Sequence, residues 1–304
     1  MIEMNIVIKV SDETKEKMMK YYASKKRDKE IPYVVFQADD EDTVITMYTS
    51  GKVMFQGVSA DVDASMWKEI DGQAERKEEK EQENKYHDCS SIGSDEVGTG
   101  DYFGPIVVTA SFVKKEDVSF LDSLGVKDSK KMTDDVILKV APQIAKRIQY
   151  KSILLTNEEY NKHHQNENNM NKIKAIMHNK VLYQLVQEVK EPYDYIIVDE
   201  FAREKRYYEY IQDAKNIQRG ITFMTKAEDK NLAVACSSII SRYLFLKEFD
   251  RMSDQLHIPL PKGAGPNVDK IGEEIVDTYG RDKLREVAKL NFKNTERILK
   301  TVIF

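Results

Sequence analysis

The sequence contains very little cysteine and no long apolar run. Its two cysteines, Cys89 and Cys236, lie far apart in unlike contexts, which argues against a disulfide framework and against a cysteine metal site. Cys236 follows four apolar residues and is predicted to be a small core residue. No unbroken apolar stretch could span a bilayer, and the N-terminus shows no signal-peptide pattern. These absences predict a cytoplasmic protein without a membrane partner.

The chain also lacks a surplus of basic residues. Its formal net charge is -5, whereas proteins that bind nucleic acid usually carry a basic excess. Lysines are nevertheless dense around Lys127, Lys130 and Lys131, and a bound divalent metal would neutralise clustered carboxylates. A basic groove on an acidic protein is therefore still open.

Several catalytic signatures are missing too. The G-x-S-x-G, H-E-x-x-H and P-loop patterns do not occur. Among the histidines, His163 and His164 lie in an Asn-rich polar stretch, His87 lies beside a charged run, and His178 and His257 are isolated. We expect surface or helix-face positions for all five, and no metal ligation or general-base role.

A highly charged segment divides the chain. Residues 71–87 have almost no apolar side chain to bury, which predicts a solvated linker or an exposed helix. Before this segment, strand patterns at 5–10, 33–36, 43–48 and 53–55 and helix patterns at 12–24 and 64–70 predict a small α+β domain over residues 1–70.

After the charged segment, strand and helix patterns alternate over residues 88–304. Strands are predicted at 91–96, 106–108, 153–155, 195–198 and 221–224, and helices near 133–148, 170–189, 232–243, 268–278, 283–290 and 295–302. This alternation predicts a larger α/β domain in which helices flank a mixed central sheet.

Carboxylates recur at the ends of these predicted strands. Asp95, Asp199 and Asp229 each end a strand or directly precede a helix, and Glu96 adjoins Asp95. Strand ends of an open α/β sheet meet at one edge, and carboxylates gathered there repel one another unless cations share the charge. Oxygen ligands favour Mg²⁺ or Mn²⁺, and two such ions about 4 Å apart would suit phosphodiester hydrolysis. Each aspartate alone has a simpler interpretation as a helix N-cap, but their joint occurrence favours a metal site.

Four motifs, taken in order, resemble the type 2 ribonucleases H. They are Ser94 to Pro105, Lys127 to Met132, Ile197 to Phe201, and Ala227 to Asp229 before the Ala/Ser-rich helix 232–241. Within this family the chain is most similar to ribonuclease HIII of bacteria, and the likeness covers about residue 88 to the end. Residues 1–70 also fit this resemblance. In ribonuclease HIII, a TATA-binding-protein-like domain precedes the ribonuclease H-like fold.

The resemblance implies an endonuclease that cuts the RNA strand of an RNA–DNA hybrid with Mg²⁺ or Mn²⁺ and leaves 5′-phosphate ends. We expect it to act as a monomer. The residues that match the family's metal-binding carboxylates are Asp95, Glu96, Asp199 and Asp229. The residues that match its substrate-binding motifs are Gly98, Thr99, Gly100, Lys127, Ser129, Lys130 and Lys131. Small residues suit the first of these motifs, because they let the backbone approach a nucleic acid strand closely. Lysines suit the second, because they hold phosphates.

Thr99 departs from the junction-cutting branch of the family. Ribonuclease HII usually has Gly-Arg-Gly where this chain has Gly98, Thr99 and Gly100, so long hybrids are the expected substrate. A junction-specific ribonuclease HII and a non-catalytic hybrid-binding protein are the alternatives.

The predicted N-terminal sheet carries aromatic residues. Tyr33, Phe36, Tyr48 and Phe55 are candidates for a surface that grips the hybrid. Ordinary core packing explains them equally well, because alternate strand residues face the covering helix.

Overall fold

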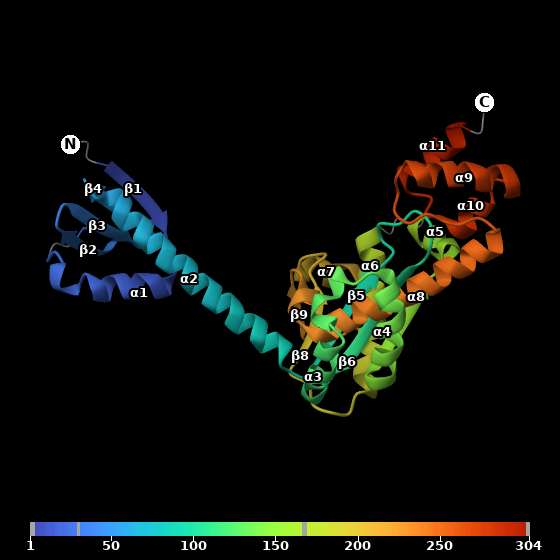
Figure 1. The fold of residues 1–304 in the computed structure, drawn as a ribbon, viewed down its shortest axis with the longest axis horizontal. Helices are drawn as coiled ribbons and strands as arrows, with labels where there is room; N and C mark the ends of the chain where they lie inside the picture. The colour runs from blue at the N-terminus through green and yellow to red at the C-terminus, as the bar shows by residue number, and fades with distance from the viewer. Residues whose placement is uncertain (1–3, 29–30, 166–168, 302–304) are drawn as a thin grey trace. The chain divides into compact units, whose positions relative to one another are not determined.

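The computed structural model describes residues 4–28, 31–165 and 169–301, apart from the side chains of 73–84, 127, 128, 130, 165 and 301. The chain divides into two compact units, Met1–Asn84 and Lys85–Phe304 (Figure 1). In the described part of the chain, no helix combines the length and the apolar character that crossing a membrane requires.

Unit 1 holds an antiparallel sheet of four strands in the order β1-β4-β3-β2. The strands are β1 (Met4–Lys9), β2 (Val34–Asp40), β3 (Thr43–Tyr48) and β4 (Lys52–Gly57). Helix α1 (Asp12–Tyr21) follows Ser11, whose hydroxyl oxygen accepts a hydrogen bond from the backbone amide of Thr14 at 3.2 Å. A 3₁₀ turn, η1 (Ala23–Lys25), extends it. The predicted strands and first helix are confirmed, with their ends moved by a few residues.

The predicted closing helix of unit 1 is much longer than the sequence pattern indicates. Helix α2 (Ala60–His87) continues through the charged segment, so that segment takes the helical form of its two predicted alternatives. Ala60, Ala64 and Trp67 recur at helical spacing and enter the core of unit 1. One turn later Asp71 accepts a hydrogen bond from the Ser11 backbone amide at 2.8 Å, which fixes the helix against the start of α1.

The four aromatic residues of unit 1 do not share one surface. Phe36 and Phe55 are buried in the core, as ordinary packing predicts. Tyr33 is 81% exposed just before β2, and Tyr48 is half-buried. Only Tyr33 and Tyr48 therefore stay candidates for a surface contact.

Unit 2 contains a mixed sheet of five strands in the order β7-β6-β5-β8-β9. The central strand β5 (Ser91–Val97) runs antiparallel to β6 (Ile106–Val113) and parallel to β8 (Tyr195–Asp199). Strand β7 (Gln149–Leu155) pairs with β6, and β9 (Ile221–Met224) pairs with β8. The predicted mixed sheet is confirmed, and its strands lie where the sequence placed them.

The helices of unit 2 are α3 (Val118–Ser123), α4 (Asp134–Arg147), α5 (Asn157–Gln165), α6 (Met170–Glu188), α7 (Glu204–Tyr210), α8 (Leu232–Leu256), α9 (Pro266–Tyr279), α10 (Lys283–Val287) and α11 (Lys293–Thr301). The described part of unit 2 also contains the 3₁₀ helices η2 (Lys115–Asp117), η3 (Val126–Lys131) and η4 (Ala227–Asp229). The sequence predicted neither α3, α5 nor α7. Each is short, and α5 is largely polar, so none carries a clear apolar stripe.

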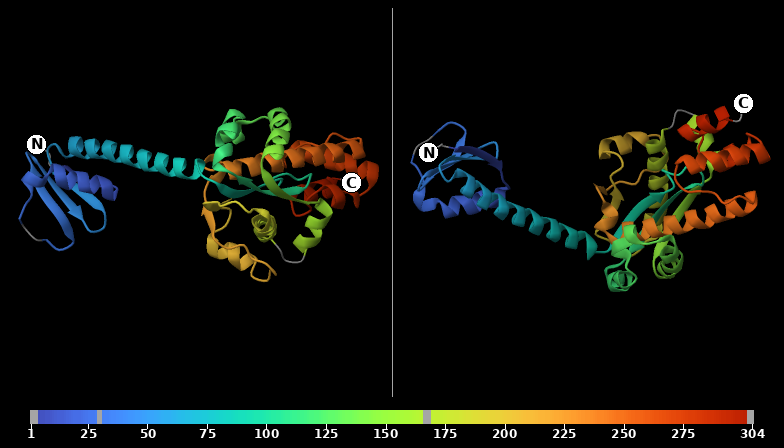
Figure 2. Two further views of the ribbon diagram at one scale, coloured as in Figure 1. Left: turned by 90° about the horizontal axis from the view of Figure 1, so that it is seen from below. Right: turned by 45° about the horizontal axis from the view of Figure 1, so that its top comes forward.

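Strand β6 explains why helices cover both faces of the sheet. All of its residues are buried, and successive side chains point to opposite faces. Val107 and Val113 pack in the core that contains α4 and α8, whereas Ile106, Val108 and Phe112 pack in the core that contains α6. Figure 2 shows α8 and α6 on opposite sides of the strands.

Helix α8 approaches β5 unusually closely at Gly93. A β-carbon at Gly93 would lie 2.3 Å from the backbone nitrogen of Val234, so only glycine fits there. Serines hold the two elements together. Ser237 donates a hydrogen bond to the Gly93 carbonyl at 2.9 Å, and Ser241 donates to the Asp95 carbonyl at 3.2 Å. The start of α8 is thereby fixed beside the carboxylate end of β5.

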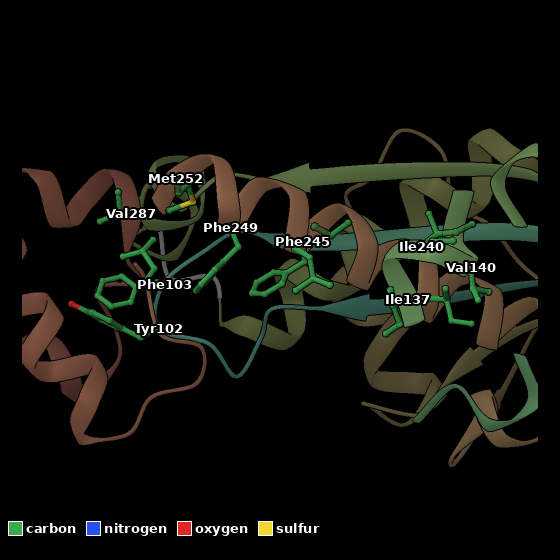
Figure 3. Packing of buried hydrophobic residues seen from close by; sticks show 14 of the residues in the cluster. Tyr102, Phe103, Ile137, Val140, Ile240, Phe245, Phe249, Met252 and Val287 are labelled. Atoms are coloured by element: carbon green, nitrogen blue, oxygen red, sulfur yellow. The ribbon is translucent and has the colours of Figure 1, made fainter. Parts of the chain in front are cut away.

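The loop after β5 is fixed by the C-terminal part of unit 2. The Lys289 backbone amide donates to the Tyr102 carbonyl at 2.9 Å, and its ammonium donates to the carbonyls of Asp101, at 2.8 Å, and Gly104. Tyr102 and Phe103 are fully buried near Phe249, Met252 and Val287 (Figure 3). The hydrogen bonds of Lys289 and the packing of Tyr102 and Phe103 therefore hold the backbone of this loop in place.

Candidate metal centre

Asp95 and Asp199 lie side by side at one edge of the sheet. The parallel register pairs Ser94 of β5 with Val198 of β8, so the next residue on each strand is one of the two aspartates. Neighbouring strands lie about 4.8 Å apart, so the two backbones hold these carboxylates close together. The predicted meeting of Asp95 and Asp199 follows directly from this register.

Asp95 and Glu96 leave β5 toward opposite faces of the sheet. Side chains alternate along a strand, and Asp95 faces α8, where it interacts with Ser238. Glu96 faces α6, where it interacts with Lys174 and His178. Adjacent positions in the sequence thus place the two carboxylates in different environments.

The surroundings of Asp95 disfavour the charged form of its carboxyl. Burial raises the pKa of its carboxyl, and the charges of Glu96 and Glu228 raise that pKa further, to about 8. Hydrogen bonds from Ser238 and from the Glu96 backbone amide, the latter at 2.8 Å, offset only part of this effect. A cation at this edge would relieve the repulsion.

Glu96 has the opposite electrostatics. Burial alone would raise the pKa of its carboxyl, but the hydrogen bond and charge of His178 and the ion pair with Lys174 outweigh it and lower the pKa to about 2. His178 Nε2 donates to Glu96 Oε2 at 2.8 Å, and Lys174 Nζ pairs with Oε1. Glu96 is therefore ionised and already paired with Lys174 and hydrogen-bonded to His178.

The turn η4 supplies the fourth acidic position. The Ala227 backbone amide donates to Asp199 Oδ1 at 2.9 Å, which ties η4 to the end of β8. Within η4, Glu228 is half-buried, and its charge acts on Asp95, while the Asp229 side chain is exposed. The structure thus brings Glu228, which the sequence analysis did not single out, toward Asp95, with the predicted Asp229 next to it.

The donor chemistry of this edge fits a hard divalent cation. All four predicted ligands offer carboxylate oxygens, which Mg²⁺ and Mn²⁺ prefer. Among the described residues, however, no three His, Cys, Asp or Glu side chains are already arranged around a common cation position. Completing such an arrangement therefore requires some of the carboxylate side chains at this edge to move.

The predicted substrate loop begins at the same edge. Gly98 has φ +97°, and a β-carbon there would lie 2.1 Å from the Pro105 carbonyl oxygen, so its conformation requires glycine. Gly100 differs, because a β-carbon there would meet nothing within 4 Å. Thr99 is half-buried between them. The protein itself thus demands glycine at Gly98 but leaves the space beside Gly100 open.

The lysine motif lies beside this site. Helix η3, which contains Lys127, Ser129, Lys130 and Lys131, packs against η4 and α8. Ser129 is buried and Lys131 is exposed, whereas the side chains of Lys127 and Lys130 lie outside the described part of the structure. The backbone of the motif therefore runs next to the turn that carries Glu228 and Asp229.

Known proteins share both the sequence and the fold. Residues 92–295 match the family described as ribonuclease HII. Ribonuclease HIII of Bacillus cereus is 38% identical over 306 residues, which cover 97% of this chain and 98% of the relative. The chain belongs to the ribonuclease HIII family. Ribonuclease HIII of Lactococcus lactis is 39% identical over 298 residues, covering 98% of this chain and 99% of the relative. The chain is therefore an endonuclease of the ribonuclease H type.

A solved ribonuclease HIII has the same architecture. The structure of Bst-RNase HIII in complex with Mn²⁺ is 34% identical, with a TM-score of 0.71 over 98% of this chain and 99% of that chain. The ribonuclease H-like fold predicted for the larger domain is thus confirmed. Residues 5–80 match a family described only as a domain of unknown function (DUF3378), consistent with a small α+β domain.

The sequence pattern did not reveal the partners of Glu96. His178 lies on a face of α6, one of its two predicted positions, but that face is buried against Glu96 and is not at the surface. The correction has a simple cause, since a single sequence does not show which strand residue a helix faces. The available signal was the spacing of Lys174 and His178, four residues apart on α6 and so on one face of that helix.

Proposed function

We propose that this protein hydrolyses the RNA strand of RNA–DNA hybrids by a two-metal mechanism and leaves 5′-phosphate products. The observation that carries the proposal is the pairing of Asp95 and Asp199 across β5 and β8, with the pKa of Asp95 raised by burial and by the charges of Glu96 and Glu228. Such an edge calls for cations. The Mn²⁺ complex of Bst-RNase HIII supports the same choice of cofactor.

In this proposal Asp95, Glu96, Asp199 and Asp229 hold Mg²⁺ or Mn²⁺. When bound, the ions supply positive charge for the scissile phosphate and lower the pKa of a coordinated water. The protein's own contribution is placement. Hydrogen bonds from Ser238 to Asp95 and from the Ala227 amide to Asp199 hold two of these carboxylates in fixed positions.

The neighbouring motifs bind the hybrid in this proposal. Gly98, Thr99 and Gly100 present backbone to the RNA strand beside the cut, and the open space at Gly100 allows that approach. Lys127, Ser129, Lys130 and Lys131 hold phosphates next to η4, since lysine and hydroxyl groups position a nucleic acid backbone. The 2′-hydroxyl distinguishes the RNA strand from DNA.

Unit 1 provides a second contact with the hybrid. We assign residues 1–70 to a substrate-binding domain, residues 71–87 to the charged helical continuation of that domain, and residues 88–304 to the catalytic domain. The exposed aromatic ring of Tyr33 supports a surface role for the small domain. The proposal also places the protein in the cytoplasm as a monomer, since a single chain supplies every residue that the proposal names.

One assay tests the substrate. The protein is incubated with Mg²⁺ or Mn²⁺ on a long RNA–DNA hybrid and on a duplex that contains one ribonucleotide. The proposal predicts that the long hybrid is cut much faster. Cleavage of the single ribonucleotide alone would make the protein a junction-specific enzyme, and binding without metal-dependent cleavage of either duplex would make it a hybrid-binding protein.

A further inference from the structure

Both carboxylate oxygens of Glu96 are engaged by one helix. Lys174 Nζ pairs with Oε1, and His178 Nε2 donates to Oε2 at 2.8 Å. The two donors lie four residues apart on α6, so they approach the carboxylate from the same side. The side chains of Lys174 and His178 are only 10% and 0% exposed, so this contact is desolvated.

His178 is itself held in place on two sides. Its Nδ1 meets the hydroxyl of Ser94, which lies two residues before Glu96 on the same face of β5. Its ring stacks on Phe201 with centroids 5.3 Å apart. A carboxylate has no proton to give, so Nε2 carries the donated proton and the ring has one orientation. Ser94 and Phe201 thus hold the His178 ring beside Glu96.

Phe201 extends this arrangement to Asp199. The Phe201 backbone amide donates to the Asp199 carbonyl at 2.9 Å, so its ring is carried by the turn that ends β8. Lys174 Nζ lies 4.1 Å from the centroid of the same ring, within cation–π range. One aromatic ring therefore contacts both partners of Glu96 and belongs to the turn that bears a second proposed ligand.

Lys174 and His178 differ in what they do to an approaching cation. Lys174 carries a full positive charge beside Glu96, and that charge repels a divalent ion at the same carboxylate. His178 leaves a lone pair of Oε2 available, because a carboxylate oxygen can accept a hydrogen bond and bind a metal together. The same helix thus presents one group that competes with a metal and one that orients its ligand.

We propose that His178 is a positioning residue for Glu96 and that Lys174 is an internal counter-ion which the metal replaces. Without metal, Lys174 balances the charge of Glu96 and holds its carboxylate toward α6. When a divalent ion binds, the ammonium gives up Oε1, and His178 keeps the carboxylate in place. This inference rests on the proposed function, because it takes Glu96 as a metal ligand.

The test is a titration of the full chain with Mn²⁺, without substrate or turnover. The electron paramagnetic resonance signal of free Mn²⁺ measures how much of the metal is bound. Lys174→Met is expected to tighten Mn²⁺ binding about tenfold, because it removes the competing charge. Lys174→Arg keeps the charge and should bind like the wild type. Lys180→Met makes the same charge change at an exposed position of α6 and serves as the matched control.

His178→Ala is expected to act in the opposite direction and to weaken Mn²⁺ binding about 10–100-fold, as loss of a residue that orients a ligand does. His178→Gln retains a side-chain N–H and should recover part of the affinity. Thermal unfolding without metal gives a second readout, in which Lys174→Met lowers the midpoint because it leaves Glu96 unpaired. If Lys174→Met fails to fold, Lys174→Gln, which keeps a donor without the charge, tests the same expectation.

Weaker or unchanged Mn²⁺ binding by Lys174→Met would overturn the counter-ion role, and unchanged binding by His178→Ala would overturn the positioning role. Glu96→Gln separates these failures from failure of the proposed function. If Glu96→Gln leaves Mn²⁺ affinity unchanged, Glu96 is not a metal ligand, whatever the helix variants do.

Discussion

At the residue scale, two neighbouring side chains, Glu228 and Asp229, are candidates for the fourth metal ligand. Asp229 follows from the sequence pattern, because it precedes a helix in the expected motif. Glu228 enters through the structure, which half-buries it and lets its charge act on Asp95. The pattern alone could not separate them, since a one-residue change along a 3₁₀ turn redirects the side chain.

A pair of isosteric variants distinguishes Glu228 from Asp229. If Asp229 holds metal, Asp229→Asn should lower the cleavage rate about 100-fold, on the scale of losing one electrostatic contact to the transition state, and Glu228→Gln should matter less. Single-turnover cleavage of a labelled hybrid measures both. The reverse ranking would assign the fourth position to Glu228.

The other site residues show what a single sequence reveals. Asp95 and Asp199 could be predicted because each lies at or near the C-terminal end of a strand, and those ends define an edge of the sheet. The contact of Lys174 and His178 with Glu96 could not be predicted, because their spacing places them on one face of α6 but does not show what that face meets. Which residues of α6 face Glu96 depends on the register of the sheet and on the rotation of α6.

At the element scale, the contact between β5 and α8 sets the site. Both elements were predicted, but their distance was not, because it depends on the missing side chain of Gly93. Helix α2 was underestimated for a related reason, since its apolar stripe ends near Asp71 while the helix continues to His87. Apolar patterning detects the buried part of an element and not its full length.

Gly93 and Gly100 make a matched pair for testing that contact. Gly93→Ala should reduce the free energy of unfolding by about 1–3 kcal/mol, because the new methyl group overlaps the backbone of α8. Gly100→Ala should leave stability unchanged, since it meets nothing, and should instead weaken hybrid binding. Urea unfolding and binding titrations measure the two effects. Equal loss of stability in both variants would refute the distinction between the close β5–α8 contact at Gly93 and the open space at Gly100.

Lys289 gives a pH dependence to the contact between the substrate loop and the C-terminal region. Burial lowers the pKa of its ammonium to about 7, although the charge of Asp101 opposes this, while an unfolded lysine titrates near 10.5. Between these values the unfolded chain holds a proton that the folded chain lacks. The free energy of unfolding should therefore rise with pH from about 7 to about 10, by up to about 1.4 kcal/mol per unit.

The comparison is with Lys289→Met, whose unfolding should lack this component. Urea unfolding of both proteins at several pH values isolates it as their difference. Below pH 7 the folded lysine is also protonated. The free energies of unfolding of the two proteins should therefore change with pH in the same way in that range. Parallel pH profiles from pH 7 to 10 would show that Lys289 does not titrate in this range.

At the scale of the whole molecule, the two units have separate cores. The sequence predicted the division from the charged segment, because a stretch without apolar residues cannot contribute to a core. The units also differ in their functional residues, because every proposed catalytic carboxylate lies in unit 2.

Removal of residues 1–84 should therefore affect binding more than chemistry. The truncated protein is expected to show a KM for the hybrid raised at least several-fold, with kcat close to that of the full chain. Steady-state kinetics on a long hybrid measures both constants. An unchanged KM would show that unit 1 does not bind the substrate.

The central claim is that Asp95 and Asp199 form a cation-dependent hydrolytic site. Its most direct test is Asp199→Asn, with hybrid binding and single-turnover cleavage measured on the same protein in Mg²⁺ and in Mn²⁺. The exposed carboxylate Asp250 on α8 provides the control, Asp250→Asn. The account predicts unchanged hybrid affinity and a cleavage rate at least about 100-fold lower for Asp199→Asn alone. Metal-dependent cleavage by Asp199→Asn at the rate of the control would contradict it.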